Sequence, residues 1–316
     1  MRVAFFGTPA FAVPTLDALA DSTHHVVGVV TQPDRARGRG QKVTFAPVKA
    51  RALALGVPIL QPERLKDDGF LRAFDDLGAD IGVVAAYGRI IPQALLDHPR
   101  LGMINVHASL LPRWRGAAPV HRAILAGDAR TGVTIMRVVF ALDAGPMIAT
   151  TTVDVDADET SADLEARLAT AGARLLISVA DRLEQTPLIG DPQDEALVTY
   201  AARIERADGD VVWARPARAI HDQIRGLHPW PHAAAMSGDR RLLLIESRVE
   251  HERETAAMPG DVLEAGPTGL VVAAAPGAVR ILRLQPEGRP AMLVRDFLNG
   301  HPLVVGARLT TPVRPS

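Results

Sequence analysis

The chain of 316 residues contains no cysteine. This absence excludes disulfide bonds, thiolate metal sites and cysteine nucleophiles, and it fits a reducing compartment, so we expect a cytoplasmic protein. No apolar stretch approaches the ~20 residues that a membrane-spanning helix needs, so no membrane partner is expected. The apolar start of the chain is broken by Gly7 and Pro9. We expect it to form a first strand rather than a signal peptide.

Metal-binding patterns and lysine are scarce as well. The ten histidines show no HExxH spacing, so the sequence predicts no metal site. Only three of the 35 basic residues are lysines, and the formal net charge is −1. A nearly neutral chain argues against indiscriminate nucleic-acid binding, which usually needs a strongly basic domain. A nucleic-acid substrate would have to be held by local patches, for which arginine is suited because it contacts phosphate in bidentate fashion.

In the first half of the chain, short apolar runs alternate with helical patterns. Such runs suit central parallel strands that are buried on both faces, and the series predicts an α/β fold with a Rossmann-like, mostly parallel sheet. The first turn, Gly7-Thr8-Pro9, lacks the later glycines of GxGxxG, which disfavours a nicotinamide dehydrogenase. The predicted strands are 3–6, 26–30, 81–86 and 103–106, and the predicted helices are 13–19, 48–55, 70–77, 93–97 and 119–126.

The pattern changes after Asp143. One further strand is predicted over 147–155, and Thr160 and Asp163 have the spacing of a capping pair at the start of a long helix. Residues 188–196 have the composition of a linker, because these nine residues include Gly190, Pro192 and three acidic residues. We therefore predict three parts, which are a catalytic domain over 1–187, a linker over 188–206 and a C-terminal domain over 207–316.

The predicted C-terminal domain combines one helix, 217–227, with several short strands separated by Gly-Pro turns. Short strands with such punctuation are typical of a small antiparallel barrel, and we expect an OB-like β-barrel. The strands are predicted over 241–246, 260–263, 269–273 and 278–284.

Asn105, His107 and Asp143 are the candidate catalytic residues. The run before Asn105 predicts a buried strand whose C-terminal edge carries the amide and the imidazole, and ligands bind at that edge in open α/β sheets. An amide, an imidazole and a carboxylate together can polarise a carbonyl and move a proton. Taken singly, each residue has an ordinary structural explanation, since the histidine could be a hydrogen-bonded core residue and the other two could belong to turns.

Arg35, Arg37, Arg39 and Lys42 form a basic loop with two glycines, directly after the second predicted strand. A solvated surface loop is the simple interpretation. Its position at the same sheet edge as the catalytic candidates favours a second one, in which an exposed, arginine-rich loop contacts phosphates.

The three candidate catalytic residues resemble the catalytic trio of the 10-formyltetrahydrofolate-dependent formyltransferases, which is Asn, His and Asp in this arrangement. The resemblance includes the segment that follows His107 and precedes Asp143, Ser109-Leu110-Leu111-Pro112-Arg113-Trp114-Arg115-Gly116. The resemblance covers nearly the whole chain, and its length narrows it to the methionyl-tRNA formyltransferases. Ala108 and Ala141 depart from the family pattern because they stand where glycine is common. Ala144 replaces a common threonine, and Arg203 replaces the usual lysine.

The resemblance implies transfer of a formyl group from 10-formyltetrahydrofolate to the α-amine of methionyl-initiator tRNA, for translation initiation and without a metal. Asn105 and His107 would stabilise the oxyanion, while Asp143 would hold the imidazole and relay the amine proton. The basic loop would contact the acceptor end of the tRNA, and the C-terminal domain its stem. Residues expected at the folate are Tyr87, Gly88, Ser109, Leu110, Leu111 and Pro112, and Arg113 and Arg115 are either surface charges or binding groups.

Two other functions fit parts of the sequence. Another formylfolate-dependent enzyme, acting on an amino-sugar nucleotide or another small amine, would share the trio. A non-catalytic RNA-binding protein on the same scaffold would leave the trio without a role. We expect a monomer, because the sequence shows no extended apolar patch and no coiled-coil repeat.

Overall fold

The computed structural model describes residues 1–37, 42–187, 189–250 and 257–313, with the backbone alone for 36, 37, 42 and 43. These residues form two compact units that interleave along the chain. Unit 1 comprises Met1–Pro119, Arg130–Asp154 and Glu165–Ala201. Unit 2 comprises Val120–Ala129, Val155–Leu164 and the described part of Ala202–Ser316. Within the predicted linker, 189–201 therefore belong to unit 1 and 202–206 to unit 2.

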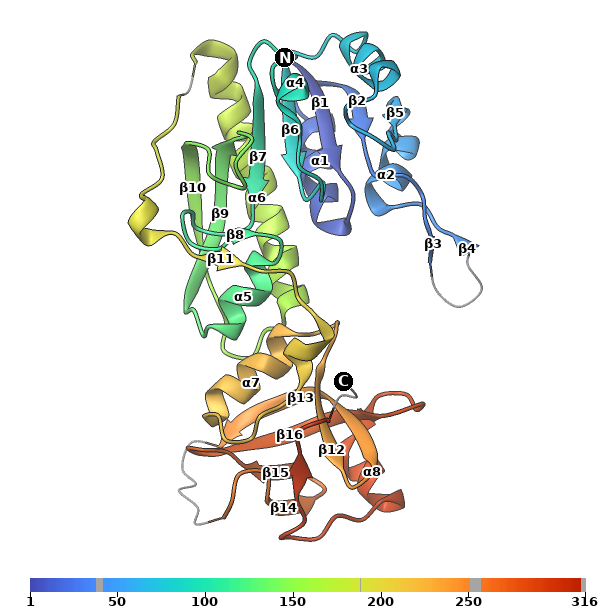
Figure 1. Cartoon of the computed structure of the whole chain (residues 1–316), viewed down its shortest axis with the longest axis vertical. Coiled ribbons are helices and arrows are strands. Elements are labelled where there is room, and N and C mark those ends of the chain that lie inside the picture. Colours follow the sequence, from blue (N-terminus) through green and yellow to red (C-terminus); the bar gives the residue numbers. More distant parts are fainter. Residues whose placement is uncertain (38–41, 188, 251–256, 314–316) are drawn as a thin grey trace. The chain divides into compact units, whose positions relative to one another are not determined.

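Unit 1 is built on a seven-stranded sheet with the order β10-β9-β7-β6-β1-β2-β5 (Figure 1). The five strands from β7 to β5 pair in parallel, whereas β9 and β10 are antiparallel additions. The predicted mostly parallel, Rossmann-like sheet is confirmed. The strands are β1 (Arg2–Gly7), β2 (His25–Val30), β5 (Ile59–Leu60), β6 (Ile81–Ala85), β7 (Met103–His107), β9 (Arg130–Arg137) and β10 (Met147–Asp154).

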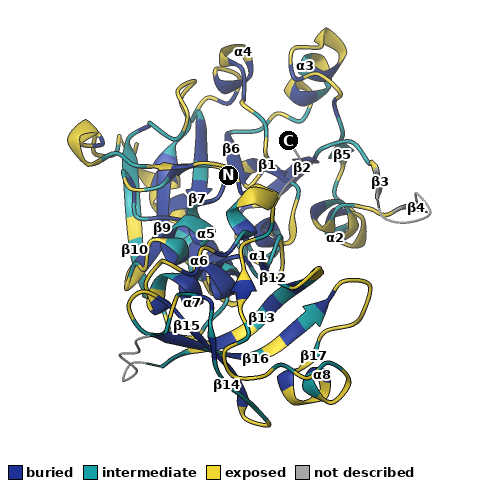
Figure 2. Ribbon diagram, turned by 60° about the horizontal axis from the view of Figure 1, so that its bottom comes forward, coloured by how far each residue is buried: buried dark blue, intermediate teal, exposed yellow. Residues whose placement is uncertain are grey.

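Helices cover the sheet, and the central strands are almost wholly buried (Figure 2). Phe6 and Met103 belong to an apolar cluster with Phe74 and Leu95, so this face of the sheet packs against α3 and α4. On the other face, Val106 lies so close to Gly172 of α6 that a Cβ atom there would come within 2.7 Å. The helices of unit 1 are α1 (Val13–Ala20), α2 (Pro47–Leu55), α3 (Asp68–Asp75), α4 (Gln93–Leu96) and most of α6 (Ser161–Gln185). All of α5 (Pro119–Leu125) except its first residue belongs to unit 2, as does the start of α6 up to Leu164.

Unit 2 contains an antiparallel sheet with the order β14-β15-β16-β13-β12-β18, and β17 pairs with β16. Backbone hydrogen bonds also join the two ends of that order, from Val262 to Ala307 at 2.8 Å and from Leu309 to Gly260 at 2.8 Å. Its elements are α7 (Ala217–Gly226), β12 (Ala233–Ser237), β13 (Arg240–Glu250), β14 (Val262–Gly266), β15 (Gly269–Ala273), β16 (Ala278–Pro286), β17 (Met292–Leu293), α8 (Val294–Gly300) and β18 (Leu309–Thr310).

A buried polar network accompanies the apolar core of unit 2. Asp222 and Arg225 of α7 form an ion pair at 2.8 Å, and both side chains are nearly inaccessible. Arg225 also donates to the carbonyl oxygens of Asp156 and Glu159. The segment before α6 is therefore fixed to α7 through a charge whose hydrogen bonds compensate for its burial. No helix of the described residues has the length and apolar content needed to cross a membrane.

The start of α6 has the predicted capping pair. The Thr160 N–H donates to Asp163 Oδ2 at 3.0 Å, and the Asp163 N–H donates to Thr160 Oγ1 at 3.3 Å. The hydroxyl of Thr160 also donates to the same carboxylate at 2.6 Å. These hydrogen bonds to the charged form hold the pKa of Asp163 below its ordinary value of 3.8.

We expect Thr160→Ala to lower the melting temperature by about 2–4 °C, the effect of losing a cap worth roughly 1 kcal/mol.

The contribution of Asp163 to the free energy of unfolding should depend on pH. Because its pKa is lowered on folding, the stabilisation is complete above the unfolded pKa and is lost as the pH falls through the folded pKa. Melting curves of wild type and Asp163→Ala should therefore differ at neutral pH and converge in acid, whereas a constant difference would contradict this.

Candidate active site

Asn105 and His107 lie at the C-terminal end of β7, and the alternation of a strand places both on the same face. Neighbouring strands hold this end from both sides, with Asn105 opposite Val84 of β6 and Met136 of β9. Asn105 is partly exposed, and within the described part of the chain its side chain makes no hydrogen bond. Its amide is therefore available to a ligand.

The imidazole of His107 is buried, with 6% of its side chain exposed, and it faces two oxygen atoms. Its Nε2 lies 2.9 Å from the Trp114 carbonyl oxygen, which can only accept, so Nε2 carries a hydrogen. Its Nδ1 lies 3.7 Å from Asp143 Oδ2. That separation is within ion-pair range, although it is longer than a direct hydrogen bond. The structure thus brings together the imidazole and the carboxylate across 36 residues of sequence.

Asp143 has a backbone conformation that the sequence did not reveal. Its φ is 48°, a left-handed value that costs a non-glycine residue on the order of 1–3 kcal/mol unless its surroundings enforce it. The Gly116 N–H donates to its Oδ2 at 2.9 Å, and the side chain of Gln193 donates to its carbonyl oxygen at 2.8 Å. Ala108, Ala141 and Ala144 all have negative φ, so none of these departures strains the backbone.

The two segments that hold Asp143 also hold each other. β8 (Arg115–Gly116) pairs in parallel with β11 (Tyr200–Ala201), just beyond the short helix η2 (Glu195–Leu197). Arg115 is 3% exposed and donates hydrogen bonds to the side chains of Gln193 and Glu195. It is therefore neither a surface charge nor an open binding group, the two roles expected from the sequence. Sequence reasoning missed Gln193 altogether, because the segment around it has linker composition. The only signal was its position after Pro192, which does not predict burial.

The stretch from Ser109 to Pro112 follows β7 directly. Ser109 is fully buried, and its hydroxyl donates to the Arg113 carbonyl oxygen at 2.6 Å. Thr134 of β9 fixes the same stretch, since its Oγ1 donates to the Ser109 carbonyl and accepts from the Leu111 N–H. A ligand at this stretch would therefore meet backbone groups and the partly exposed Leu110 and Pro112, rather than the serine hydroxyl.

Tyr87 and Gly88 follow β6, next to the end of β7. The Tyr87 ring packs edge-on against Phe6 in the core, and burial raises the pKa of its hydroxyl to about 12. Its carbonyl accepts from Gln32 Nε2 at 2.8 Å. The flanking Ala86 and Gly88 are exposed, with φ of 45° and 79°. A ligand here would contact the backbone of this turn, because the tyrosine side chain points into the core.

The basic loop begins at the same sheet edge, after β2. Arg35 is exposed, and Arg37 on β3 (Ala36–Arg37) lies opposite Lys42 on β4 (Lys42–Val43) in a short hairpin. Arg39 lies outside the described residues. The base of the hairpin is fixed by Asp34, which pairs with Lys49 and accepts from Gln61. The Lys49 hydrogen bond holds the pKa of Asp34 below its usual value.

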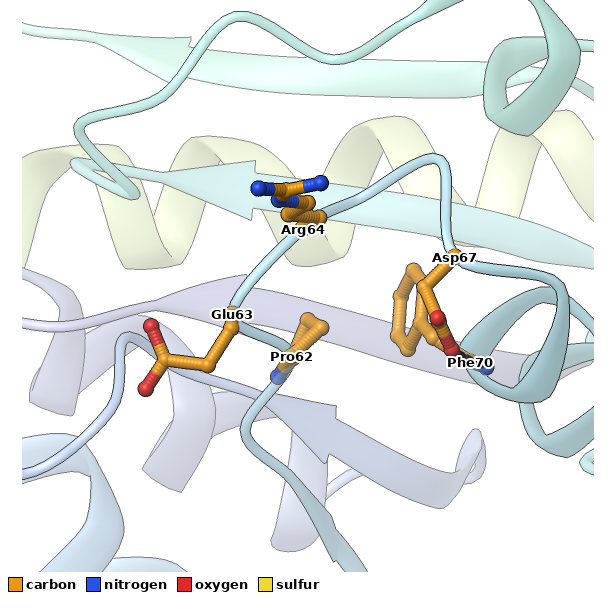
Figure 3. A pocket seen from close by; sticks show the side chains of 5 residues that line it. All are labelled: Pro62, Glu63, Arg64, Asp67 and Phe70. Atoms are coloured by element: carbon orange, nitrogen blue, oxygen red, sulfur yellow. Dashed lines mark hydrogen bonds between the residues drawn. The ribbon is translucent and has the colours of Figure 1, made fainter.

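A separate pocket opens between β5 and α3, lined by Pro62, Glu63, Arg64, Asp67 and Phe70 (Figure 3). Arg89, which follows Gly88, donates to the carbonyl oxygens of Pro62 and Glu63 at 3.0 Å each. The wall of this pocket is thus tied to the turn at Tyr87, but none of the three candidate catalytic residues lines it. Within the described ranges, no group of three or more histidine or acidic side chains is arranged to hold a metal ion.

Comparison with known proteins identifies the family of the chain. A family model described as Formyl transferase matches residues 1–180, and one described as Formyl transferase, C-terminal domain, matches residues 203–302. The chain belongs to the formyl transferase family. A methionyl-tRNA formyltransferase of Roseobacter denitrificans is 46% identical over 306 residues, which cover 97% of this chain and 98% of the relative. A methionyl-tRNA formyltransferase of Ruegeria pomeroyi is 47% identical over 310 residues, which cover 98% and 100%. These relatives place the chain in the methionyl-tRNA formyltransferase branch of the family.

Solved structures with the same fold are more distant in sequence. HypX from Aquifex aeolicus, in complex with tetrahydrofolic acid, superposes with a TM-score of 0.65 at 16% identity, over 94% of this chain and 47% of that protein. An N-formyltransferase from Helicobacter canadensis, in complex with folinic acid and dTDP-3-aminofucose, gives 0.67 at 16% identity, over 89% and 98%. At these identities the likeness concerns the fold.

Gly116→Ala should impair formyl transfer. The φ of Gly116 is 121°, and a Cβ atom would lie 2.8 Å from the Ala201 carbonyl oxygen, so the backbone must shift. We expect this shift to move the Gly116 N–H away from the Asp143 carboxylate. Displacing a catalytic group by ~1 Å costs about 10²-fold in rate, and we expect a fall in kcat of that order. Gly56→Ala is the matched control, since Gly56 has a φ of 68° with no atom within 4 Å of the added carbon. It should lower stability and leave kcat unchanged. Full activity in Gly116→Ala would show that its amide is not needed.

Proposed function

We propose that the chain transfers the formyl group of 10-formyltetrahydrofolate to the α-amine of methionyl-initiator tRNA, yielding N-formylmethionyl-tRNA for translation initiation. The observation that carries the proposal is the convergence of Asn105, His107 and Asp143 at the C-terminal edge of the sheet. The names of relatives that align over nearly the full chain support the choice of acceptor.

The reaction is an acyl transfer between two nitrogen atoms. The neutral α-amine attacks the formyl carbon and forms a tetrahedral intermediate whose oxygen carries the negative charge. The bond between that carbon and N10 then breaks, the former amine loses a proton, and N10 of tetrahydrofolate gains one. Because free α-amines titrate near pH 8, neutral amine is available without a strong base, and positioning should dominate the rate.

Asn105 and His107 would stabilise the oxyanion. The Asn105 amide has no hydrogen-bond partner in the described part of the chain, so it can donate without breaking a contact. The Nε2 hydrogen of His107 is directed at the Trp114 carbonyl. A substrate oxygen that replaces this carbonyl would receive the same donor. Each such donor is typically worth about 10²–10³-fold in rate.

Asp143 would orient the imidazole and receive or relay the amine proton. Its carboxylate lies 3.7 Å from Nδ1 of His107 and remains partly accessible, with 17% of the side chain exposed. A group that is held firmly yet still reached from solvent is suited to both tasks, and proton relay of this kind contributes about 10²–10⁴-fold.

The folate would lie along the turn that contains Tyr87 and Gly88 and along Ser109, Leu110, Leu111 and Pro112. Both segments follow neighbouring parallel strands, β6 and β7, and therefore meet at one edge of the sheet. The exposed backbone at Ala86 and Gly88 fits the polar edge of a flat heteroaromatic ring, and the partly exposed Leu110 offers it an apolar contact. The proposal uses no metal.

For the acceptor, we propose that Arg35, Arg37, Arg39 and Lys42 contact tRNA phosphates and that the C-terminal domain, 207–316, binds the stem. The hydrogen bonds that join the starts of the first and last strands, β14 and β18, to the residues just before each other support an OB-like barrel. Barrels of this kind bind nucleic acid in many proteins. We further propose a cytoplasmic monomer.

Asn105→Ala, His107→Ala and Asp143→Ala should each lower kcat by about 10²–10⁴-fold while changing KM for both substrates little, because each removes an interaction made in the transition state. The assay measures formyl transfer to methionyl-tRNA, with an amino-sugar nucleotide as the competing acceptor. His25→Ala, which alters an exposed histidine at the opposite end of β2, is the control and should be fully active. Preference for the sugar would refute the proposed acceptor, and near-normal turnover of a variant would remove that residue from the trio.

Arg39→Ala and Lys42→Ala should raise KM for methionyl-tRNA without changing KM for the folate. Loss of one phosphate contact should reduce the magnitude of the slope of log affinity against log salt concentration by about one. Binding measurements over roughly 50–200 mM salt, where this effect is large, would detect the change. Arg182→Ala removes an equal charge from the exposed side of α6 and should leave tRNA binding unchanged. Equal effects of all three substitutions would indicate a non-specific response to net charge.

A further inference from the structure

Gln193 lies in a segment with linker composition, yet its side chain is among the buried polar groups of unit 1, with 9% exposed. Its amide makes three hydrogen bonds. Nε2 donates to the carbonyl oxygens of Asp143 and Gly145, both at 2.8 Å, and Oε1 accepts from Arg115 Nε at 2.8 Å. Both amide hydrogens are therefore used on the loop that carries the catalytic carboxylate.

Arg115 extends the network outward. Its guanidinium bonds Glu195 with both terminal nitrogens, at 2.9 and 3.4 Å, which fixes the orientation of the Nε–H toward Gln193. The next residue, Gly116, donates its N–H to the Asp143 carboxylate at 2.9 Å. Asp143 is thus held at its carbonyl by Gln193 and at its carboxylate by Gly116, and the two holding groups are connected through Arg115.

This double attachment accounts for the left-handed φ of Asp143, a conformation that persists only where the surroundings enforce it. The segment around Gln193 has other attachments of its own. Asp191 and Met147 exchange two backbone hydrogen bonds of 2.8 Å, and the Thr199 carbonyl accepts from the Arg115 N–H at 2.9 Å. Removal of the Gln193 amide should therefore leave the segment in place and release mainly the Asp143 loop.

We propose that Gln193 is a positioning residue for catalysis, which aims the Asp143 carboxylate at His107 by holding the backbone of the 143–145 turn. The inference rests on the proposed function, in which Asp143 orients the imidazole. Gln193 itself touches no reacting atom. Its effect should therefore appear in kcat and should require the carboxylate of Asp143.

The test compares Gln193→Ala and Gln193→Glu with wild type. The glutamate keeps the shape and the acceptor toward Arg115 but places an oxygen against two carbonyl oxygens, so it reverses the interaction with the loop. We expect both variants to lose about 10–100-fold in kcat, with KM for both substrates within about threefold, since a misplacement of ~1 Å has an effect of this order. Gln223→Ala is the matched control, because Gln223 also donates to two backbone carbonyls, those of Asp208 and Asp210, in unit 2. It should keep its kcat.

The deciding measurement is the double variant with Asp143→Ala. If Gln193 acts through Asp143, its substitution should have no further effect on kcat in that background, whereas an equal loss in both backgrounds would overturn the proposal. Unchanged kcat in both single variants would overturn it as well. Hydrogen exchange of the Gly116 amide provides a readout without activity, and we expect at least about tenfold faster exchange in Gln193→Ala. If the wild-type protein fails to formylate methionyl-tRNA, the proposed function is refuted. The hydrogen-exchange measurement would still decide whether the Gln193 side chain holds the Asp143 loop.

Discussion

The position of one carboxylate, that of Asp143, links the elements of unit 1. It lies on a loop between two antiparallel strands, β9 and β10, while its partner His107 ends a parallel strand. The backbone of a loop is not fixed by the regular hydrogen bonds of a strand, so the carboxylate needs additional attachments to stay beside the imidazole. The Gly116 amide and the Gln193 side chain supply them, and Arg115 connects the two.

The site therefore combines two kinds of support. The sheet fixes Asn105 and His107, because β7 is paired with a neighbouring strand on both sides. The alternation of a strand places these two residues, which are two positions apart, on the same face. The carboxylate is fixed by side-chain and loop hydrogen bonds from segments far away in the sequence. A displacement of either β7 or the Asp143 loop would separate the imidazole from the carboxylate. The distance of 3.7 Å between His107 Nδ1 and Asp143 Oδ2 therefore depends on residues outside the trio.

The fold alone does not decide the acceptor. The HypX and Helicobacter canadensis structures each share 16% identity with this chain, and the second contains an amino-sugar nucleotide in its complex. The proposed tRNA contacts are assigned to elements outside the trio, which are the hairpin at Arg37 and Lys42 and the antiparallel sheet of unit 2. This assignment follows the general observation that function resides in sites placed on shared folds and not in the fold itself.

The amino-acid sequence by itself determined four of the five parallel strands of unit 1, all but the two-residue β5, together with the capping pair of α6 and the order of the trio, because these depend on local patterns. The apolar runs at 3–6 and 81–86 and the Thr160–Asp163 spacing predict their structures without knowledge of distant residues. Strand β9 was missed because Thr131, Gly132 and Thr134 give it a weak apolar pattern, and β12 was missed because three of its five residues are alanines. Only the tertiary structure decided the burial of Arg115 and Gln193, the inward direction of the Tyr87 ring and the left-handed turn at Asp143. Each of these results from hydrogen bonds or packing between segments separated by tens of residues, for which no local pattern in the sequence carries a signal.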